Sequence, residues 1–127
     1  MAPPFAETRL ELVLFGAGGF RFGVEARQVL AARAAERDEA PLRVERLLAL
    51  GEEPSSARGR VVLRVGSGSS GLDVAVEGPV ELLGVAAASV HPLPPLLAAR
   101  TRLQGLRALA FVEGQLLPLV DLVGVRH

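Results

Sequence analysis

The chain has 127 residues, half of them hydrophobic, and its 14 basic residues balance its 14 acidic residues. This length suffices for one compact domain with an apolar core, and the zero net charge excludes a general electrostatic attraction to nucleic acid or to an anionic membrane. Because the sequence has no cysteine and only two histidines, disulfides and thiolate metal sites are excluded, and we expect no metal or other cofactor.

The first two predicted strands form a hairpin. Apolar residues alternate along Arg9–Phe15, which is the pattern of a strand with one buried face. Gly16–Gly19 then turns the chain into a second short strand, Phe20–Val24.

Helices are predicted in the Glu25–Leu50 region. Residues 25–37 are rich in Ala, Arg, Glu and Leu, which favour helix formation. Leu42–Leu50 repeats apolar residues at helical spacing. We therefore expect one or two helices here, followed by a polar linker over Gly51–Ala57.

Beyond the linker the apolar period returns to two, which predicts further short strands. Gly66–Gly71 and Glu113–Gly114 contain the glycines of hairpin turns. The fold class is therefore mostly β, in the form of a small barrel or sandwich. The predicted strands cover Arg60–Val65, Leu72–Val76, Val80–Val85, Leu106–Val112 and Gln115–Leu122.

One glycine-rich segment suggests an alternative function. A strand that runs into Gly16–Gly23 resembles the loop with which NAD(P)-type folds hold a pyrophosphate at a helix N-terminus. However, the last glycine comes one residue late, and Phe20–Phe22 continues an alternating strand where a helix should begin. A small nucleotide-binding protein is thus the alternative, and a hairpin turn is the favoured interpretation.

No residue of the chain is predicted to be catalytic. His91 has no carboxylate nearby in sequence to orient it. Asp73 and Glu77 would lie on one face of a strand about 13 Å apart, too far for a carboxylate pair that cleaves glycosides. No serine lies in a nucleophile elbow.

Several segments, taken in order, resemble the CheW-like adaptor domain of bacterial chemosensory systems. Each is weak alone, and their shared order carries the resemblance. Together they cover about three quarters of the chain. They are Leu12–Gly16, Phe22–Leu30, Val61–Val65, Gly71–Val76, Val80–Leu83, Val90–Pro94, Leu103–Leu106 and Glu113–Leu122.

The resemblance implies a single domain over residues 1–127, built of two small SH3-like β-barrel subdomains. The first, about residues 8–50, is expected to be shortened and incomplete, because only Val44–Leu50 stands where the family has a longer segment. The second covers residues 60–124. Dimerisation or the Glu25–Leu50 helices would cover the exposed strand edge of the first barrel, and we favour the helices.

The resemblance also implies a function. Such domains are non-enzymatic scaffolds that couple a chemoreceptor to a CheA-type histidine kinase, and a shortened member would bind both partners or only one of them. The resemblance implies a place in receptor arrays. We expect the protein in the cytoplasm, because the N-terminus lacks a secretory signal and no apolar segment approaches the roughly 20 residues of a membrane-spanning helix.

The same resemblance suggests two protein-binding regions. The receptor-facing patch corresponds to Arg27, Gln28, Val29 and Leu30, with Val29 as its apolar centre, although Val29 and Leu30 would serve equally well as core residues. The kinase contact falls on the second barrel. It is expected around Leu72, Val74 and the turns near Gly78 and Gly114.

Overall fold

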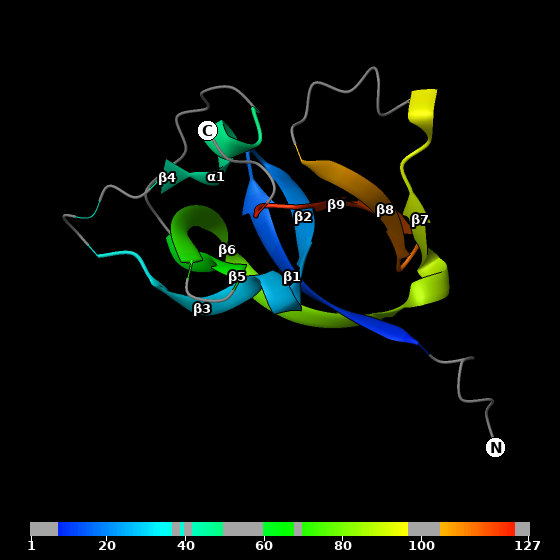
Figure 1. Ribbon diagram of the computed structural model, residues 1–127, viewed down its shortest axis with the longest axis horizontal. Helices are drawn as coiled ribbons and strands as arrows, with labels where there is room; N and C mark the ends of the chain where they lie inside the picture. The colour runs from blue at the N-terminus through cyan, green and yellow to red at the C-terminus, as the bar shows by residue number, and fades with distance from the viewer. Residues whose placement is uncertain are drawn as a thin grey trace.

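The computed structural model describes residues 8–36, 39, 42–49, 60–67, 70–96 and 105–123. Most of these residues lie in strands, and the strands form a single sheet (Figure 1). The predicted linker Gly51–Ala57 lies outside them. None of the helices they form is long and apolar enough to cross a membrane. The strands are β1 (Arg9–Ala17), β2 (Phe20–Glu25), β3 (Val29–Ala34), β4 (Leu42–Arg43), β5 (Arg60–Ser67), β6 (Ser70–Ala86), β7 (Val90–Pro92), β8 (Leu106–Val112) and β9 (Gln115–Val120).

The strands follow one open path, β3-β5-β6-β1-β2-β9-β8-β7, with β4 paired to β6 beside it. Among the described residues the path does not close on itself. Short helical elements include η1 (Ala26–Gln28), α1 (Val44–Leu47) and η2 (Ala87–Ser89). The mostly β fold class is therefore confirmed.

The predicted hairpin at the start of the chain is confirmed. β1 and β2 pair antiparallel from Leu12↔Glu25 to Ala17↔Phe20. The two residues between the strands, Gly18 and Gly19, have φ angles of 57° and 84°. This left-handed backbone favours glycine and matches the twist of a two-residue hairpin.

The helix expected over residues 25–37 is wrong. The chain makes only the short turn η1 there and then enters β3, which pairs antiparallel with β5 from Val29↔Val65 to Ala34↔Val61. Helix propensity is a weak preference, and pairing with a long neighbouring strand overrides it. Consequently β3, and not a helix, lies along the edge of β5. The second expected helix is confirmed in a shorter form, as α1.

The strands predicted over Leu72–Val76 and Val80–Val85 are parts of one strand, β6, which has 17 residues and passes through a cis peptide bond between Gly78 and Pro79. The first half of β6 pairs with β5, and its second half pairs with β1. β6 therefore connects the part of the sheet around β5 to the part around β1, as its long course across Figure 1 shows.

Two apolar cores lie on opposite faces of β1. Val13 and Phe15 point into the larger core, whereas Leu12 and Leu14 point into the smaller one, as the two-residue period of a strand requires. The larger core combines β1 and β2 with α1, β5 and the first half of β6. It therefore contains residues that precede the predicted linker and residues that follow it. The smaller core joins β1 and the second half of β6 to β8 and β9.

A single parallel contact joins β2 to β9, at Gly23↔Leu119. A Cβ atom on Gly23 would lie 2.8 Å from Leu119 Cδ2 and 3.2 Å from Leu117 Cδ2. Since both leucines are buried, a larger residue at position 23 would have to push the strands apart. The glycine thus allows the β8–β9 hairpin to lie against the β1–β2 hairpin.

Ion pairs connect β3 to β6 and β5 to β6. The Arg33 guanidinium donates hydrogen bonds to the Glu39 carboxylate, with Nη1 2.7 Å from Oε1, and the Glu36 N–H donates to the same oxygen at 3.1 Å. The arginine bond is the main cause that lowers the pKa of Glu39 from 4.5 to about 2. Arg33 also lies 3.7 Å from Asp73, which pairs with Arg64 at 3.4 Å.

A lowered carboxyl pKa makes stability depend on pH in a defined direction. The contribution of Glu39 is complete above its ordinary pKa of 4.5, and it is lost as the pH falls through its folded-state pKa of about 2. We expect Glu39→Gln to flatten the acid dependence of the urea midpoint over this interval. Glu113→Gln is the matched control, because Glu113 is exposed and takes part in none of the ion pairs found among the described residues. Equal slopes for all three proteins would contradict the prediction.

Candidate functional site

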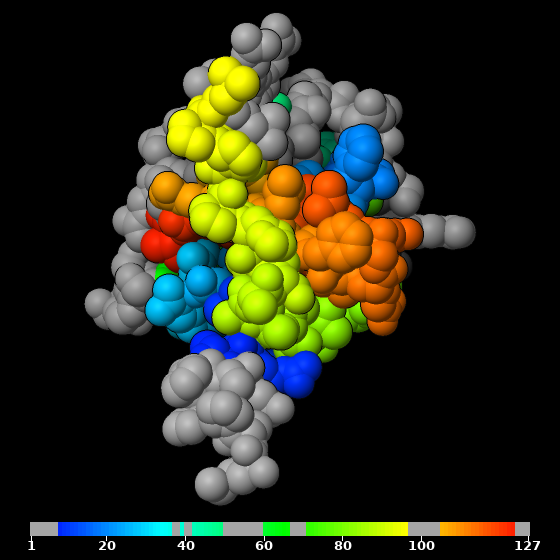
Figure 2. All heavy atoms as spheres, turned by 90° about the vertical axis from the view of Figure 1, so that its right-hand side faces the viewer, coloured from blue at the N-terminus to red at the C-terminus, as the bar shows by residue number. Residues whose placement is uncertain are grey.

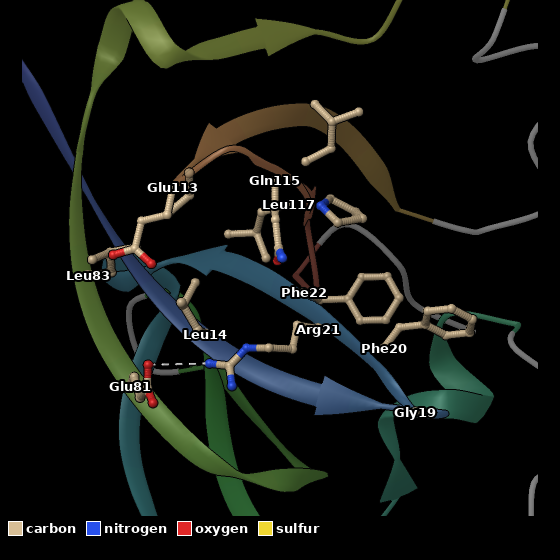
Figure 3. A pocket seen from close by; sticks show the side chains of 13 residues that line it. Leu14, Gly19, Phe20, Arg21, Phe22, Glu81, Leu83, Glu113, Gln115 and Leu117 are labelled. Atoms are coloured by element: carbon tan, nitrogen blue, oxygen red, sulfur yellow. Dashed lines mark hydrogen bonds and ion pairs between the residues drawn. The ribbon is translucent and has the colours of Figure 1, made fainter.

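An open groove of about 800 Å³ lies between the β1–β2 hairpin, the second half of β6 and the β8–β9 hairpin (Figure 3). Three segments that are distant in sequence build it, and they meet because β1 pairs with β6 and β2 contacts β9. It is lined by Leu14, Gly19, Phe20, Arg21, Phe22, Glu81, Leu83, Val112, Glu113, Gln115, Leu116, Leu117 and Pro118.

The groove is apolar at its floor and at part of its rim. Leu14 and Leu117 are buried and belong to the smaller core. At the rim, Phe20 is 67% exposed and Leu116 is 60% exposed. Large apolar side chains that border a concave surface in this way are typical of a protein-docking site.

A further apolar side chain extends this surface along β8. Phe111 is 52% exposed and pairs directly with Leu116 across the β8–β9 ladder, and directly paired residues share one face of a sheet. The β8–β9 hairpin, in orange, forms the right-hand part of the face in Figure 2. The apolar area therefore continues from the groove onto the adjoining face of the sheet.

Two charged side chains of the groove, Arg21 and Glu81, form an ion pair. Arg21 Nη2 lies 3.4 Å from Glu81 Oε2, and both side chains are about half exposed, so this pair contributes little stability. In Figure 3 Arg21 points toward Glu81, whereas Phe20 and Phe22 point the other way. Within the described ranges no group of three or more His, Cys, Asp or Glu could hold a metal ion.

The turn between β1 and β2 contradicts the nucleotide-binding alternative. A pyrophosphate loop needs a helix that begins directly after the glycines. Here Phe20 instead enters β2, antiparallel to β1. Gly16–Gly23 is therefore a hairpin.

The predicted receptor-facing residues lie on η1 and β3, away from the residues that line the groove. The Arg27 side chain is highly exposed and pairs with Glu25, and Gln28 is half-buried beside it. Val29, the expected centre, is half-buried and packs against the larger core. Leu30 is 47% exposed and is the large apolar side chain that this patch offers to solvent.

The residues predicted for the second contact are divided between core and surface. Val74 is fully buried in the larger core, and Leu72 is partly buried against it, so Val74 presents no side chain to a partner. The turn near Gly114, by contrast, lies at the groove, because Glu113 and Gln115 on either side of it are lining residues.

Sequence reasoning missed Phe20 and Leu116. Alternation was a signal for Leu116 alone, because Leu117, which faces the other side of β9, is buried. Phe20 shares a face of β2 with buried Phe22, so alternation gave no sign that Phe20 is exposed. Whether an apolar residue next to a glycine turn is exposed depends on the partner strand, which the local pattern does not identify.

Comparison with known proteins adds evidence on the fold. No protein-family model matches the chain, and no curated protein matches it in sequence. Among solved structures, the scaffolding protein TtCheW from Thermoanaerobacter tengcongensis matches with a TM-score of 0.71, over 93% of this chain and 92% of that chain. The chain has a CheW-like fold. The two sequences are 13% identical, so the likeness concerns the CheW-like fold alone, and it confirms the resemblance inferred from the sequence.

Proposed function

We propose that this protein is a non-catalytic adaptor of a bacterial chemosensory system, located in the cytoplasm within receptor arrays. The observation that carries the proposal is a CheW-like fold with an apolar groove whose rim exposes Phe20 and Leu116. TtCheW, whose structure resembles this chain, is a scaffolding protein. A groove with apolar walls and no catalytic arrangement among the described residues suits protein docking better than chemistry.

In this proposal the two surfaces take different partners. The groove includes the turn around Gly114, which the resemblance assigns to the kinase contact, so it docks the regulatory domain of a CheA-type histidine kinase. The patch at Arg27–Leu30 takes the helical tip of a chemoreceptor, with Leu30 as its exposed apolar anchor. An adaptor with both surfaces intact couples the two proteins, and one with a single working surface binds only one of them.

A charge placed at the groove rim is expected to remove kinase binding. Leu116→Glu puts a carboxylate among apolar contacts, which would have to lose its hydration when the partner docks. We expect the dissociation constant for the kinase regulatory domain to rise about tenfold or more. Isothermal titration calorimetry with that domain, purified from the same organism, measures the change.

Two matched leucines control this experiment. Leu82 is 70% exposed on β6 outside the groove, so Leu82→Glu should leave both affinities unchanged. Leu30→Glu should weaken capture of a chemoreceptor signalling fragment and leave kinase binding intact. Equal loss in all three variants, or no binding by the wild-type protein, would overturn the proposal. Light scattering on the same samples tests the homodimer that the sequence left open.

A further inference from the structure

One charged side chain is buried among the described residues, and it contacts the tip of the hairpin that forms the groove rim. Glu45 lies in α1 and is 2% exposed. Its Oε2 accepts a hydrogen bond from the Gly18 backbone N–H at 3.2 Å, across 27 positions of sequence. Its Oε1 lies 3.8 Å from Arg43 Nε. Figure 3 shows Gly19, at the end of the hairpin, next to the helix.

The geometry of the turn explains why this N–H needs an outside acceptor. A two-residue turn is closed by a hydrogen bond that the N–H of its fourth residue donates to the carbonyl of its first residue, which leaves the N–H of the second residue unused. Gly18 is that second residue, because Ala17 and Phe20 form the last ladder pair. Gly19 offers no side chain to hold the turn, and a Cβ atom at this position would have no atom within 4 Å.

Fold stability alone does not require a carboxylate here. α1 is already anchored by Val44, Leu47 and the adjoining Leu48, which are all buried in the larger core. A buried ion pair is often replaced by apolar residues with no loss of stability, because removing charges from water costs free energy. What the carboxylate adds is a directional bond to the turn, one residue before Gly19 and two before Phe20, which both line the groove.

We propose that Glu45 is a positioning residue that fixes the hairpin tip and so sets how Phe20 is presented to the partner in the groove. The identity of the docking partner rests on the proposed function. The contact between Glu45 and the turn can be tested without that partner. α1 would thereby influence the shape of a docking site whose other walls are the second half of β6 and the β8–β9 hairpin.

Two variants of similar size separate the acceptor from the rest of the side chain. Glu45→Leu removes the acceptor, and Glu45→Gln keeps an oxygen that can accept the same bond. We expect amide hydrogen exchange at Gly18, measured by NMR, to accelerate about tenfold in the leucine variant and to stay near the wild-type rate in the glutamine variant. Unchanged exchange in Glu45→Leu, or failure of this variant to fold, would overturn the positioning role.

Binding of the kinase regulatory domain completes the test. Glu45→Leu should weaken it about tenfold, and Glu45→Gln should restore it. If Glu45 acts through Phe20, Glu45→Leu should cause no further loss in a Phe20→Ala background, as a double-mutant cycle reveals. Additive losses, or wild-type affinity in the leucine variant, would overturn the inference. A wild-type protein that does not bind the kinase domain would overturn the proposed function, while the exchange rates would still decide whether Glu45 holds the turn.

Discussion

Replacing Val74 by aspartate is expected to unfold the protein. Val74 has no exposed surface, and its ladder partners are Leu63 on β5, also fully buried, and Leu42 on β4. A carboxylate without a partner in such a core costs several kcal/mol, which is comparable with the roughly 5–15 kcal/mol that keeps a domain of ordinary stability folded.

Circular dichroism checks this expectation directly. The Val74→Asp protein should lack a cooperative thermal transition, whereas the same substitution at exposed Leu82, on the same strand, should alter stability by less than about 1 kcal/mol. A Val74→Asp protein that melts like the wild type would show that the side chain has access to solvent. The result bears on function, because a loss of partner binding in a Val74 variant would reflect unfolding and not a lost contact.

The hairpins of this chain could be predicted from sequence because their signals are local. Gly18–Gly19 and Glu113–Gly114 both take positive φ angles, and both lie between strands of alternating character. A turn of two residues fixes the register of its strands. The glycines predicted the turns, while the register of the first hairpin came from the structure, where Gly16 and Ala17 still belong to β1.

The strand β3 could not be predicted in this way. Its sequence, Val29–Ala34, is rich in alanine and favours helix locally. It becomes a strand because β5, with one edge occupied by β6, offers its other edge for pairing. That condition depends on a segment about thirty residues away.

The groove was inaccessible to sequence reasoning for the same kind of reason. Its walls come together through the parallel contact between Gly23 and Leu119, and no local pattern indicates which distant strand a glycine will approach. Glu45 is a similar case, since a lone glutamate in an amphipathic segment usually lies in solvent. Here it is buried because the hairpin tip packs over α1.

Replacing Phe15 by alanine is expected to cost about 3–5 kcal/mol of unfolding free energy. Phe15 is fully buried, and its ring stacks on Phe22 with a centroid separation of 6.0 Å and an interplanar angle of 24°. Both rings lie in the larger core, which the hairpin forms together with α1, β5 and the first half of β6. Alanine removes the transfer free energy of the ring and leaves a cavity that the surrounding strands fill only in part.

Phe20→Ala is the matched control, because it removes the same side chain from the same hairpin at a position that is 67% exposed. Its unfolding free energy, measured by urea titration, should change by about 0.5 kcal/mol or less, yet its affinity for the kinase regulatory domain should fall. Phe15→Ala should do the reverse: while it remains folded, the groove rim is unchanged and binding persists. Two phenylalanines five residues apart would thus separate stability from docking, and equal destabilisation by both substitutions would contradict the assignment of Phe20 to the groove rim.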